Sequence, residues 1–566
     1  MFYQSLVKNL VCFLIGTSLL GMVSCGGDSH TFPDLSENLA VCGNGFIESG
    51  EICDDGNDRE TDACLNDCTQ AFCGDGRVHE GVEACDDGND LNNDDCTNHC
   101  SLSTCGDGIV QEDEACDDGN TNNEDGCLNT CMIATCGDGF VQAGSEECDD
   151  GNNIDDGSCM ADCSAPTVLQ VVSGIDHACV LLEDGLVKCW GRGEWGMLGY
   201  GNTNNIGDDE LPKVVGEVSL GAPAVQLAAG YSHTCALLET GGVKCWGEAS
   251  FGQLGYGNTE DIGDDELPSS VGEVDIGIGG NIVQLVTGGY HTCVLSDLGT
   301  VRCWGENSFG QLGYGHTWRI GHNQVPSMSP VGGDVDVGGF VTQLSAGPQT
   351  TCALLDTGTV RCWGWNNYGQ LGYGNLENIG DDESPSSIGD INVGGTVSKI
   401  SAGASHTCAL LDTGTVRCWG GAIWGQLGYG NTNDIGDDED PVTAGDVQIG
   451  GGIVADLVAY NSHTCVLLET GSVRCWGLNV YGQCGYVHDG TNLYIGNNEL
   501  PSSVGDVEVG GPVLQLAPDG SNTCALLESG GVRCWGWNTH GELGYGNLEN
   551  IGDNETPTDA GDIDLF

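Results

Sequence analysis

Basic residues are scarce in this sequence. Its 566 residues include 14 Lys+Arg against 84 Asp+Glu, which gives a formal net charge of -70. A surface that binds nucleic acid needs clustered lysine and arginine to neutralise phosphates. Adsorption to anionic lipid by charge alone needs the same residues. The composition therefore argues against a nucleic-acid partner and against attachment to a membrane through charge.

Catalytic motifs are missing as well. The sequence contains no G-x-S-x-G, no Walker loop and no H-E-x-x-H. These short patterns mark common hydrolase, nucleotide-binding and metalloprotease sites. We therefore expect a protein that is not an enzyme and that has no certain cofactor.

Glycine and cysteine, in contrast, are abundant. The 95 glycines favour turns and strands over helices, because glycine destabilises a helix, so we expect an all-β protein. The 33 cysteines would be hard to keep reduced in the cytosol, which favours an exported, disulfide-bonded protein.

The N-terminus has the features of an export signal. Lys8 precedes an apolar run over residues 10–23, which is too short to span a bilayer comfortably. Small residues then lead to Cys25, and this pattern resembles the bacterial lipoprotein signal, in which the cysteine is acylated. The resemblance implies a signal peptide over 1–24, lipidation of Cys25 and a lipid-anchored tether over 25–41. Because Gly26 follows the cysteine in place of aspartate, we expect localisation at the outer membrane or cell surface.

Residues 42–163 form four small cysteine-rich repeats. The units start at Cys42, Cys73, Cys105 and Cys136, and each has four cysteines, a CGDG-like turn and the sequence C-D-D-G-N. Units of this size cannot bury a hydrophobic core, so we expect two disulfides to hold each one. Four cysteines allow three pairings, and spacing alone does not choose between them. The units resemble the cysteine-rich repeat of myxobacterial surface proteins.

Two metals are candidates for these repeats. Zinc is disfavoured, because the cysteines are 4, 11 or 12 residues apart and an exported protein would oxidise them. Calcium is the candidate ion for the aspartates in the glycine-rich turns, because their carboxylates offer hard oxygen ligands. The alternative is that these residues only form tight turns. The candidate calcium ligands are Asp54, Asp55, Asp86, Asp87, Asp117, Asp118, Asp149 and Asp150.

Residues 165–566 form a seven-fold repeat with a period of 56 to 59 residues. Short alternating apolar runs with frequent glycine at such a period indicate a propeller or a solenoid. Four strands per unit would give a closed seven-bladed β-propeller, and closure removes long unpaired edges. The first and last segments would lie side by side if the end units complete a shared blade.

Each unit contains two cysteines ten residues apart in a predicted β-hairpin. With a three-residue loop ending in glycine, as at Gly241, Cys235 lies directly opposite Cys245. Directly opposed Cβ atoms are close enough for a disulfide. The predicted pairs are Cys179–Cys189, Cys235–Cys245, Cys293–Cys303, Cys352–Cys362, Cys408–Cys418, Cys465–Cys475 and Cys524–Cys534. Cys484 is then left over, and we expect it to be buried and unreactive.

The segments H-T-C-A-L-L, V-R-C-W-G and G-Q-L-G-Y-G resemble the regulator of chromosome condensation repeat. The resemblance implies a seven-bladed propeller. Members of that family include a nuclear guanine-nucleotide exchange factor and a secreted bacterial inhibitor of β-lactamases, so the fold alone does not decide the function. No unit of this chain carries a long insertion of the kind that the exchange factor uses against its GTPase.

Several side chains that recur from unit to unit are predicted to be structural. Five histidines precede a hairpin cysteine by two places, and we expect them to hydrogen-bond to a loop, because catalysis needs one histidine and not five. The basic residue of each V-R-C-W-G segment is expected to pair with a carboxylate of the repeat. The tryptophan of that segment is expected to pack between blades.

Partner-binding residues should lie where the repeat is broken. Acidic Gly-Asp-Asp-Glu loops are replaced in unit three by aromatic, basic and amide residues, and unit six also departs. Aromatic and arginine side chains are enriched at interface hot spots. The candidates are His316, Trp318, Arg319 and His322 in unit three, with His488 and Tyr494 in unit six. The alternative is neutral variation of tolerant surface loops.

These observations predict a lipid-anchored cell-surface binding or adhesion protein whose propeller recognises a protein or glycan partner. The alternative is a regulator, such as a guanine-nucleotide exchange factor or an enzyme-inhibitor propeller. An exchange factor must meet its GTPase in the cytosol, so the export signal favours the first function.

Overall fold

The computed structural model describes residues 41–566 except 112–113, 150, 153–158, 330–332, 489, 491–492 and 519. The predicted signal peptide and Cys25 lie outside the described residues. Within the described part, no helix has the length and apolar character needed to cross a bilayer.

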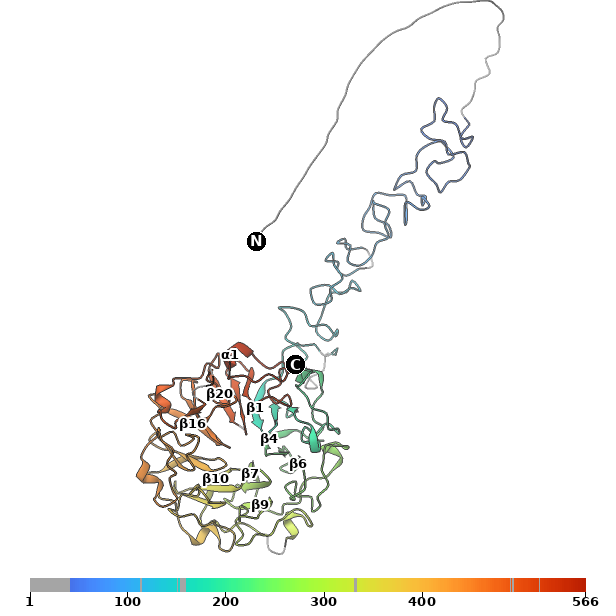
Figure 1. Cartoon of the computed structure of the whole chain (residues 1–566). Coiled ribbons are helices and arrows are strands. Elements are labelled where there is room, and N and C mark those ends of the chain that lie inside the picture. The colour runs from blue at the N-terminus through green and yellow to red at the C-terminus, as the bar shows by residue number, and fades with distance from the viewer. Residues whose placement is uncertain are drawn as a thin grey trace, which may run out of the picture. The chain divides into compact units, whose positions relative to one another are not determined.

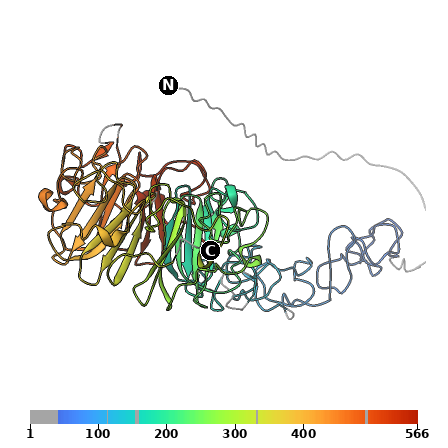
Figure 2. The ribbon, with the colours of Figure 1, turned by 90° about the horizontal axis from the view of Figure 1, so that it is seen from below.

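The repeat region forms seven antiparallel sheets arranged around a central axis, one sheet per repeat (Figure 1). Figure 2 shows the ring from the side, with the connecting loops at the two ends of the strands. The all-β, seven-bladed prediction is confirmed. Six blades have three strands and the sixth blade has four, so the expected fourth strand is mostly absent.

The strands of blades one to four are β1 (Val168–Ser173), β2 (His177–Leu182) and β3 (Val187–Gly191); β4 (Ala224–Ala229), β5 (His233–Leu238) and β6 (Val243–Gly247); β7 (Ile282–Thr287), β8 (His291–Ser296) and β9 (Val301–Gly305); β10 (Val341–Ala346), β11 (Thr350–Leu355) and β12 (Val360–Gly364). Those of blades five to seven are β13 (Val397–Ala402), β14 (His406–Leu411) and β15 (Val416–Gly420); β16 (Val454–Tyr460), β17 (His463–Leu468), β18 (Val473–Leu478) and β19 (Tyr494–Ile495); β20 (Val513–Pro518), β21 (Asn522–Leu527) and β22 (Val532–Gly536).

Helices are short and lie in the connecting segments. They are η1 (Glu194–Gly196), η2 (Pro212–Val214), η3 (Pro268–Ser270), η4 (Pro326–Met328), η5 (Pro385–Ser387), η6 (Pro441–Ala444), η7 (Pro501–Ser503) and α1 (Pro557–Ala560). Proline begins all of them except η1, because its fixed φ suits the first helical position.

Three separate contacts replace the missing fourth strand at the outer edge of the three-stranded blades. In blade one, Gly191 forms a bridge with Ile206, and the amide of Val218 donates to Val187. Between them, the hydroxyl of Tyr200 accepts from the Cys189 amide at 3.0 Å and donates to its carbonyl at 3.1 Å. Six equivalent tyrosines accept from the equivalent cysteine amide. The edge is therefore satisfied without a strand that could pair with another chain.

A buried tryptophan closes each junction between blades, as predicted. The indole N–H of Trp246, at the end of β6, donates to the carbonyl of Met197 in the preceding blade at 3.0 Å. The hydroxyl of Thr234 donates to the same carbonyl at 3.2 Å. All seven equivalent tryptophans are fully buried and make this bond at 2.9–3.1 Å.

The repeated histidines are structural, but their partner is the next blade and not a loop. The Nε2 atom of His177 lies 2.8 Å from the hydroxyl of Thr234. Because that hydroxyl already donates to a carbonyl, the imidazole must donate to it. Burial lowers the pKa of His177 to about 4, so the ring is neutral. His233, His291, His406 and His463 make the same bond.

Two junctions lack this hydrogen bond. Thr350 stands in the histidine place of blade four and Asn522 in that of blade seven. The side chain of Asn522 would meet Ala178 in blade one, which has no hydroxyl, and its amide oxygen has no hydrogen-bond partner. Because Ala178 replaces the threonine, the junction of blades seven and one lacks both the bond from the histidine place and the threonine bond to the preceding carbonyl.

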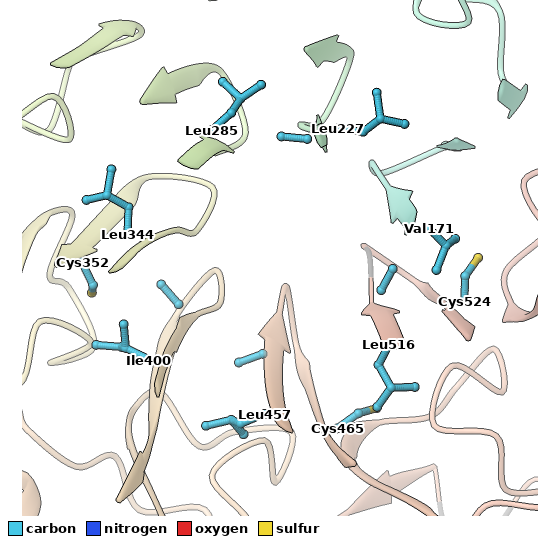
Figure 3. Close-up of a cluster of buried hydrophobic side chains, with 14 of the residues drawn as sticks. Val171, Leu227, Leu285, Leu344, Cys352, Ile400, Leu457, Cys465, Leu516 and Cys524 are labelled. Carbon is cyan, nitrogen blue, oxygen red and sulfur yellow. The ribbon is translucent and has the colours of Figure 1, made fainter. Parts of the chain in front are cut away.

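The first strand of each blade lines the centre of the ring. One apolar side chain per blade points into the surrounding core, namely Val171, Leu227, Leu285, Leu344, Ile400, Leu457 and Leu516 (Figure 3). Glutamines of these strands bridge neighbouring blades: Gln170 donates to Leu227 at 3.0 Å and accepts from it at 2.8 Å. In blades five and six, Lys399 and Asp456 replace the glutamine and form an ion pair. The strands line a central cavity of ≈ 270 Å³ that is open to solvent.

The ring closes without a shared blade. β1 pairs only with β2 of its own repeat, while Ile563 near the C-terminus hydrogen-bonds to Val532 of blade seven. The last and first blades are linked through side chains, since Lys188 donates to the carbonyl of Leu565 at 3.0 Å. Each blade is therefore a continuous piece of chain.

All seven hairpin disulfides are closed. Their Cα atoms are 4.0–4.1 Å apart, the close spacing of a non-hydrogen-bonded pair. Cys484 is free and fully buried, and its thiol lies 3.3 Å from the carbonyl oxygen of Leu478.

The cysteine-rich repeats use one nested pairing. The first cysteine bonds to the fourth and the second to the third, as in Cys42–Cys68 and Cys53–Cys64. The described part divides into two compact units; the second comprises Asn122–Leu128 and Ile133–Phe566. The fourth repeat therefore belongs to the same unit as the propeller, and Phe566 packs against its buried cysteines.

The basic ring of the third strands is paired internally, as predicted. Arg361 donates to Asp390 at 2.7 Å and to the carbonyl of Val337, in the preceding unit, at 2.6 Å. Arg302, Arg417, Arg474 and Arg533 pair with equivalent aspartates, and Lys188 with Glu217. Lys244 instead donates to two carbonyls.

Gly288→Ala should lower the free energy of unfolding by about 1–3 kcal/mol, the usual cost of overpacking. A Cβ atom there would lie 2.1 Å from Cε1 of His291 and 2.6 Å from the carbonyl oxygen of Gly347, so the histidine that bonds the next blade must move. Chemical denaturation of both proteins measures the difference. Gly272→Ala is the matched control, because its Cβ would have no atom within 4 Å. Equal losses in the two variants would contradict the packing role of Gly288.

Candidate binding face

Two sets of loops lie at one end of the ring. The second and third strands of each blade are antiparallel, and His177 at the start of β2 pairs with Gly191 at the end of β3. The turn before the second strand and the segment after the third strand therefore share an end. We call this the loop end.

An aromatic position recurs at the loop end, two residues before the glutamine of G-Q-L-G-Y-G. Its members, which we call the aromatic belt, are Trp195, Phe251, Phe309, Tyr368, Trp424, Tyr481 and His540. All are partly accessible to solvent. These residues were not predicted as site residues, although an aromatic residue recurs at one fixed place in six of the seven units.

Buried glutamines hold the belt in position. The backbone N–H of Phe251 donates to Oε1 of Gln253 at 2.9 Å, and Gln253 is fully buried. The same bond fixes Phe309, Tyr368, Trp424 and Tyr481. The backbone that carries these rings is therefore already ordered before a partner binds.

Trp195 is the exception in backbone conformation. Met197 replaces the glutamine in blade one, and Trp195 has φ 58°, in the left-handed region that large residues rarely adopt. The guanidinium of Arg192 lies 5.1 Å from its ring centroid and donates to Asp176 at 3.0 Å.

The belt meets different residues at each blade junction. Phe309 lies 6.2 Å from Trp365 of the next blade, measured between ring centroids. Trp424 stacks on Tyr494 at 5.3 Å, and Tyr481 meets Trp537 edge-on at 4.0 Å. The buried contacts of the repeat are therefore the same at each junction, while the solvent-accessible side chains next to the belt differ around the ring.

Arg319, a predicted partner-binding residue, is occupied within the chain. Its Nε atom pairs with Glu306 at 2.6 Å, and its guanidinium lies 4.6 Å from the Phe251 ring centroid. In five blades an aspartate or asparagine stands in its place and accepts a backbone N–H, as Asp261 does from Ala249 at 2.8 Å. The longer arginine side chain at this position does not make that bond and extends instead over Phe251 of the neighbouring blade.

In unit six, Tyr494 replaces the same aspartate or asparagine that Arg319 replaces in unit three. It precedes an Ile-Gly pair as Arg319 does, and it stacks on Trp424 of blade five. The predicted loops of units three and six therefore open toward the same end. The structure does not bring the two loops together, since each packs on the blade that precedes it.

Trp318 is the candidate that remains free. Its side chain is 64% exposed, and it stacks on His316 at 5.2 Å. The side-chain amide of Asn307 donates to the carbonyls of His316 and Trp318 at 2.6 and 3.1 Å, so the loop is held rigidly. His322 and His488 are only partly exposed, and the His488 amide donates to the carbonyl of Asp553 at 3.1 Å.

One group of potential metal ligands lies at the junction of blades seven and one. Ligand atoms of Asp176, His540 and Glu542 all lie within 4.8 Å of one another. These side chains already have partners, because His540 Nδ1 lies 3.1 Å from a carboxylate oxygen of Glu542 and Arg192 forms an ion pair with Asp176. Burial raises the pKa of Glu542, which replaces the glutamine of other blades.

Acidic loops pack beside the belt. In Gly-Asp-Asp-Glu loops, burial together with neighbouring aspartates raises the pKa of Glu210, Glu266, Glu383 and Glu439 to about 7. The four glutamates therefore bind protons near neutral pH, well above the range of an ordinary glutamate.

The first aspartate of each C-D-D-G-N sequence binds the backbone of its own repeat. Asp54 accepts from the amides of Gly43, Asn44, Gly45 and Gly56 at 2.7–3.1 Å. Asp86, Asp117 and Asp149 accept four equivalent amides. Four donors fill the lone pairs of a carboxylate. The geometry thus argues against the predicted calcium-ligand role for these four residues.

The pKa values agree with this structural role. Desolvation would raise the pKa of Asp54, Asp86 and Asp117, but the backbone donors outweigh it and lower the pKa. Asp55, Asp87 and Asp118 each accept one backbone amide. Calcium binding by these three stays a prediction, and Asp150 lies outside the described residues.

Comparison with protein families gives matches over both regions. The RCC1-like domain matches residues 263–564, and the regulator of chromosome condensation (RCC1) repeat matches 168–194, 184–237 and 224–253. A domain of unknown function, DUF4215, matches 97–132 and 128–164 in the cysteine-rich repeats.

Among characterised proteins, the chain is similar to the ultraviolet-B receptor UVR8 of Arabidopsis thaliana. The identity is 30% over 385 residues, which cover 67% of this chain and 79% of the receptor. The chain is also 30% identical to the human E3 ubiquitin-protein ligase HERC2 over 286 residues, but this match covers only 6% of the ligase. Among solved structures, yeast RCC1 bound to Kap60 is similar in fold, with a TM-score of 0.52 and 20% identity over 69% of this chain and 84% of that one.

The acidic loops should make stability fall as pH rises from about 6.5 to 8. The pKa of each loop glutamate, about 7 when folded, lies above its ordinary value of 4.5, so the folded protein binds the extra protons. Their contribution is complete below the unfolded pKa and is lost as pH rises through the folded pKa. The melting temperature across this range measures the effect.

A variant with glutamine at all four positions isolates this contribution. The histidines have the opposite effect below about pH 6.5, since burial lowers their pKa to about 3 or 4. The four-fold variant should show a flatter profile, whereas Glu499→Gln, flanked by Asn497 and Asn498, should not. Identical slopes for wild type and the four-fold variant would show that these glutamates do not titrate in this range.

Proposed function

The chain belongs to the RCC1-like domain family, and from this premise we propose that it is an exported, lipid-anchored protein whose propeller binds a protein partner at the loop end. The fold is that of a protein-interacting or regulatory domain. Lipid attachment, surface location and the kind of partner are the parts that we propose.

The disulfides support export. The chain has seven closed disulfides inside the propeller and nested pairs in the cysteine-rich repeats. Disulfides of this number persist outside the cytosol and are rare inside it. The N-terminal apolar run and Cys25 are consistent with that address.

The variable chemistry of the aromatic belt is the observation that supports partner binding. The tryptophan, tyrosine and disulfide contacts of the framework recur in every blade, while belt neighbours range from arginine to tryptophan. A propeller needs only the framework to fold. Rigid aromatic side chains at one end are suited to recognition, because aromatic residues are enriched in interface hot spots.

The first experiment tests the address. Cys25→Ala should abolish incorporation of a radiolabelled fatty acid and release the protein from the membrane fraction, because the acylated cysteine would be the anchor. Cys12→Ala is the matched control, since this cysteine lies within the apolar run. Full membrane retention of Cys25→Ala, together with no label on wild type, would exclude lipid anchoring.

The second experiment tests the binding face. Trp318→Ala should weaken capture of a cross-linked surface partner by about 30-fold, which corresponds to the hot-spot threshold of about 2 kcal/mol. Leu514→Ala removes an equally exposed side chain, 57% accessible, at the opposite end of the ring and should have no effect. Arg319→Ala should also remove the cation–π contact with Phe251. This variant therefore tests the belt position and not an arginine that is available to a partner. If Trp318→Ala captures the same proteins with unchanged affinity, the loop of unit three is not the interface.

A further inference from the structure

We infer that Phe309, Trp365 and Tyr368 form a binding site for the cationic side chain, arginine above all, of a basic protein segment. The site lies at the loop end, at the junction of blades three and four. The inference rests on the proposed function and names the chemistry of the partner.

The three rings form a cluster with different orientations. The ring centroids of Phe309 and Trp365 are 6.2 Å apart with planes inclined by 49°, and those of Trp365 and Tyr368 are 5.4 Å apart with planes inclined by 86°. Tyr368 is 42% exposed, and the other two rings are partly exposed. Aromatic rings that meet at steep angles present several π-faces and edges to one cation, as in the aromatic cages that bind ammonium groups.

Backbone hydrogen bonds hold all three residues in place. The amides of Phe309 and Tyr368 donate to the buried Gln311 and Gln370 at 3.0 Å. The amide of Trp365 donates to the carbonyl of Gln349 at 2.9 Å. The cluster is thus formed before any ligand arrives.

The same molecule shows how such rings are used at the preceding junction. There the guanidinium of Arg319 lies 4.6 Å from Phe251 and pairs with Glu306. Phe251 and Phe309 occupy the same position in consecutive repeats. Arg192 over Trp195, paired with Asp176, is a second example. Belt rings combined with carboxylates therefore accept guanidinium groups in this protein.

The two junctions differ in where the cation could come from. The loop behind Phe251 has lost its acids: His322 packs against Gly252, and Asn323 and Gln324 follow. The loop behind Phe309 keeps them, because Asp381 packs against Gly310, with its amide 2.3 Å from the position of a Cβ there. Asp382 and Glu383 follow.

Within the described residues, the cation–π contacts are those of Lys188, Arg192 and Arg319, so none involves Phe309, Trp365 or Tyr368. The junction of blades three and four therefore has three rings next to an acidic loop, and within the described residues no cation–π contact supplies them with a guanidinium from their own chain. With a net charge of -70, the chain also attracts basic segments over a distance.

The test uses the full chain in detergent micelles and two synthetic peptides. One carries three arginines in a glycine–serine spacer, and the other carries citrulline, the neutral isostere, at the same places. Calorimetry at a fixed ionic strength should show binding of the arginine peptide and at least about tenfold weaker binding of the citrulline peptide.

Substitutions locate the site. Trp365→Ala should weaken binding of the arginine peptide about tenfold, while Trp365→Phe keeps an aromatic ring and should retain most of the affinity. Leu514→Ala, at the opposite end, should bind as wild type does. A melting temperature close to that of wild type for each variant shows that the propeller is intact.

Two outcomes would overturn the inference. Equal affinity of wild type and Trp365→Ala would mean that the peptide is held by diffuse negative charge. Preferential binding of a neutral oligosaccharide, lost in Trp365→Ala, would mean that the rings stack on sugars. Failure of the proposed function is distinguishable, because then no surface protein is captured although the arginine peptide still binds through Trp365.

Discussion

The hydrogen bond from a buried indole N–H to the carbonyl of the preceding blade is the contact on which the ring depends. It occurs at all seven junctions, and at six of them a threonine hydroxyl donates to the same carbonyl. Two donors on one acceptor fix both the distance and the rotation between blades. Every blade is therefore positioned by its neighbour, and the rest of each repeat can vary.

Contacts within a blade and contacts between blades use different residue types. The disulfides and the tyrosine hydroxyls at the blade edge form bonds within one blade. The tryptophan, threonine, histidine and glutamine side chains form bonds between blades. Neither set uses the exposed positions of the loop end. Those positions are free to differ, and the structure shows arginine, carboxylate, imidazole and indole groups at equivalent places around one ring.

Local and periodic features were predictable from the sequence. The ten-residue cysteine spacing with a glycine in the loop determines a hairpin in which the two cysteines face each other, and a period near 57 residues can only accommodate a small sheet per repeat. The nested pairing of the cysteine-rich repeats was not predictable, because three connectivities satisfy the same spacing. The replacement of a fourth strand by a tyrosine hydroxyl depends on contacts across 11 residues that no periodicity reveals.

The candidate site was predicted less completely. Trp318 was found because it interrupts an acidic loop, and it is indeed exposed. Arg319 was chosen for the same reason, yet it reaches Phe251 and Glu306, a contact between repeats that a single unit does not show. The aromatic belt was not predictable in the same way, because its members recur in every repeat and a recurring residue resembles a framework residue in the sequence.

The disulfides have a mechanical consequence. Each joins residues ten apart inside one hairpin, and none of the seven crosses a junction, so the ring is not closed covalently. Tension between the two chain ends acts on the junction of blades seven and one, where Asn522 faces Ala178 without the usual hydrogen bond. A propeller under tension would open first at this junction. The blades would then detach one at a time, while the disulfide of each hairpin keeps its two strands joined. The chain would therefore lengthen in steps under load. Each step would be shorter than the full length of a blade, because the residues between the two cysteines of its disulfide cannot extend.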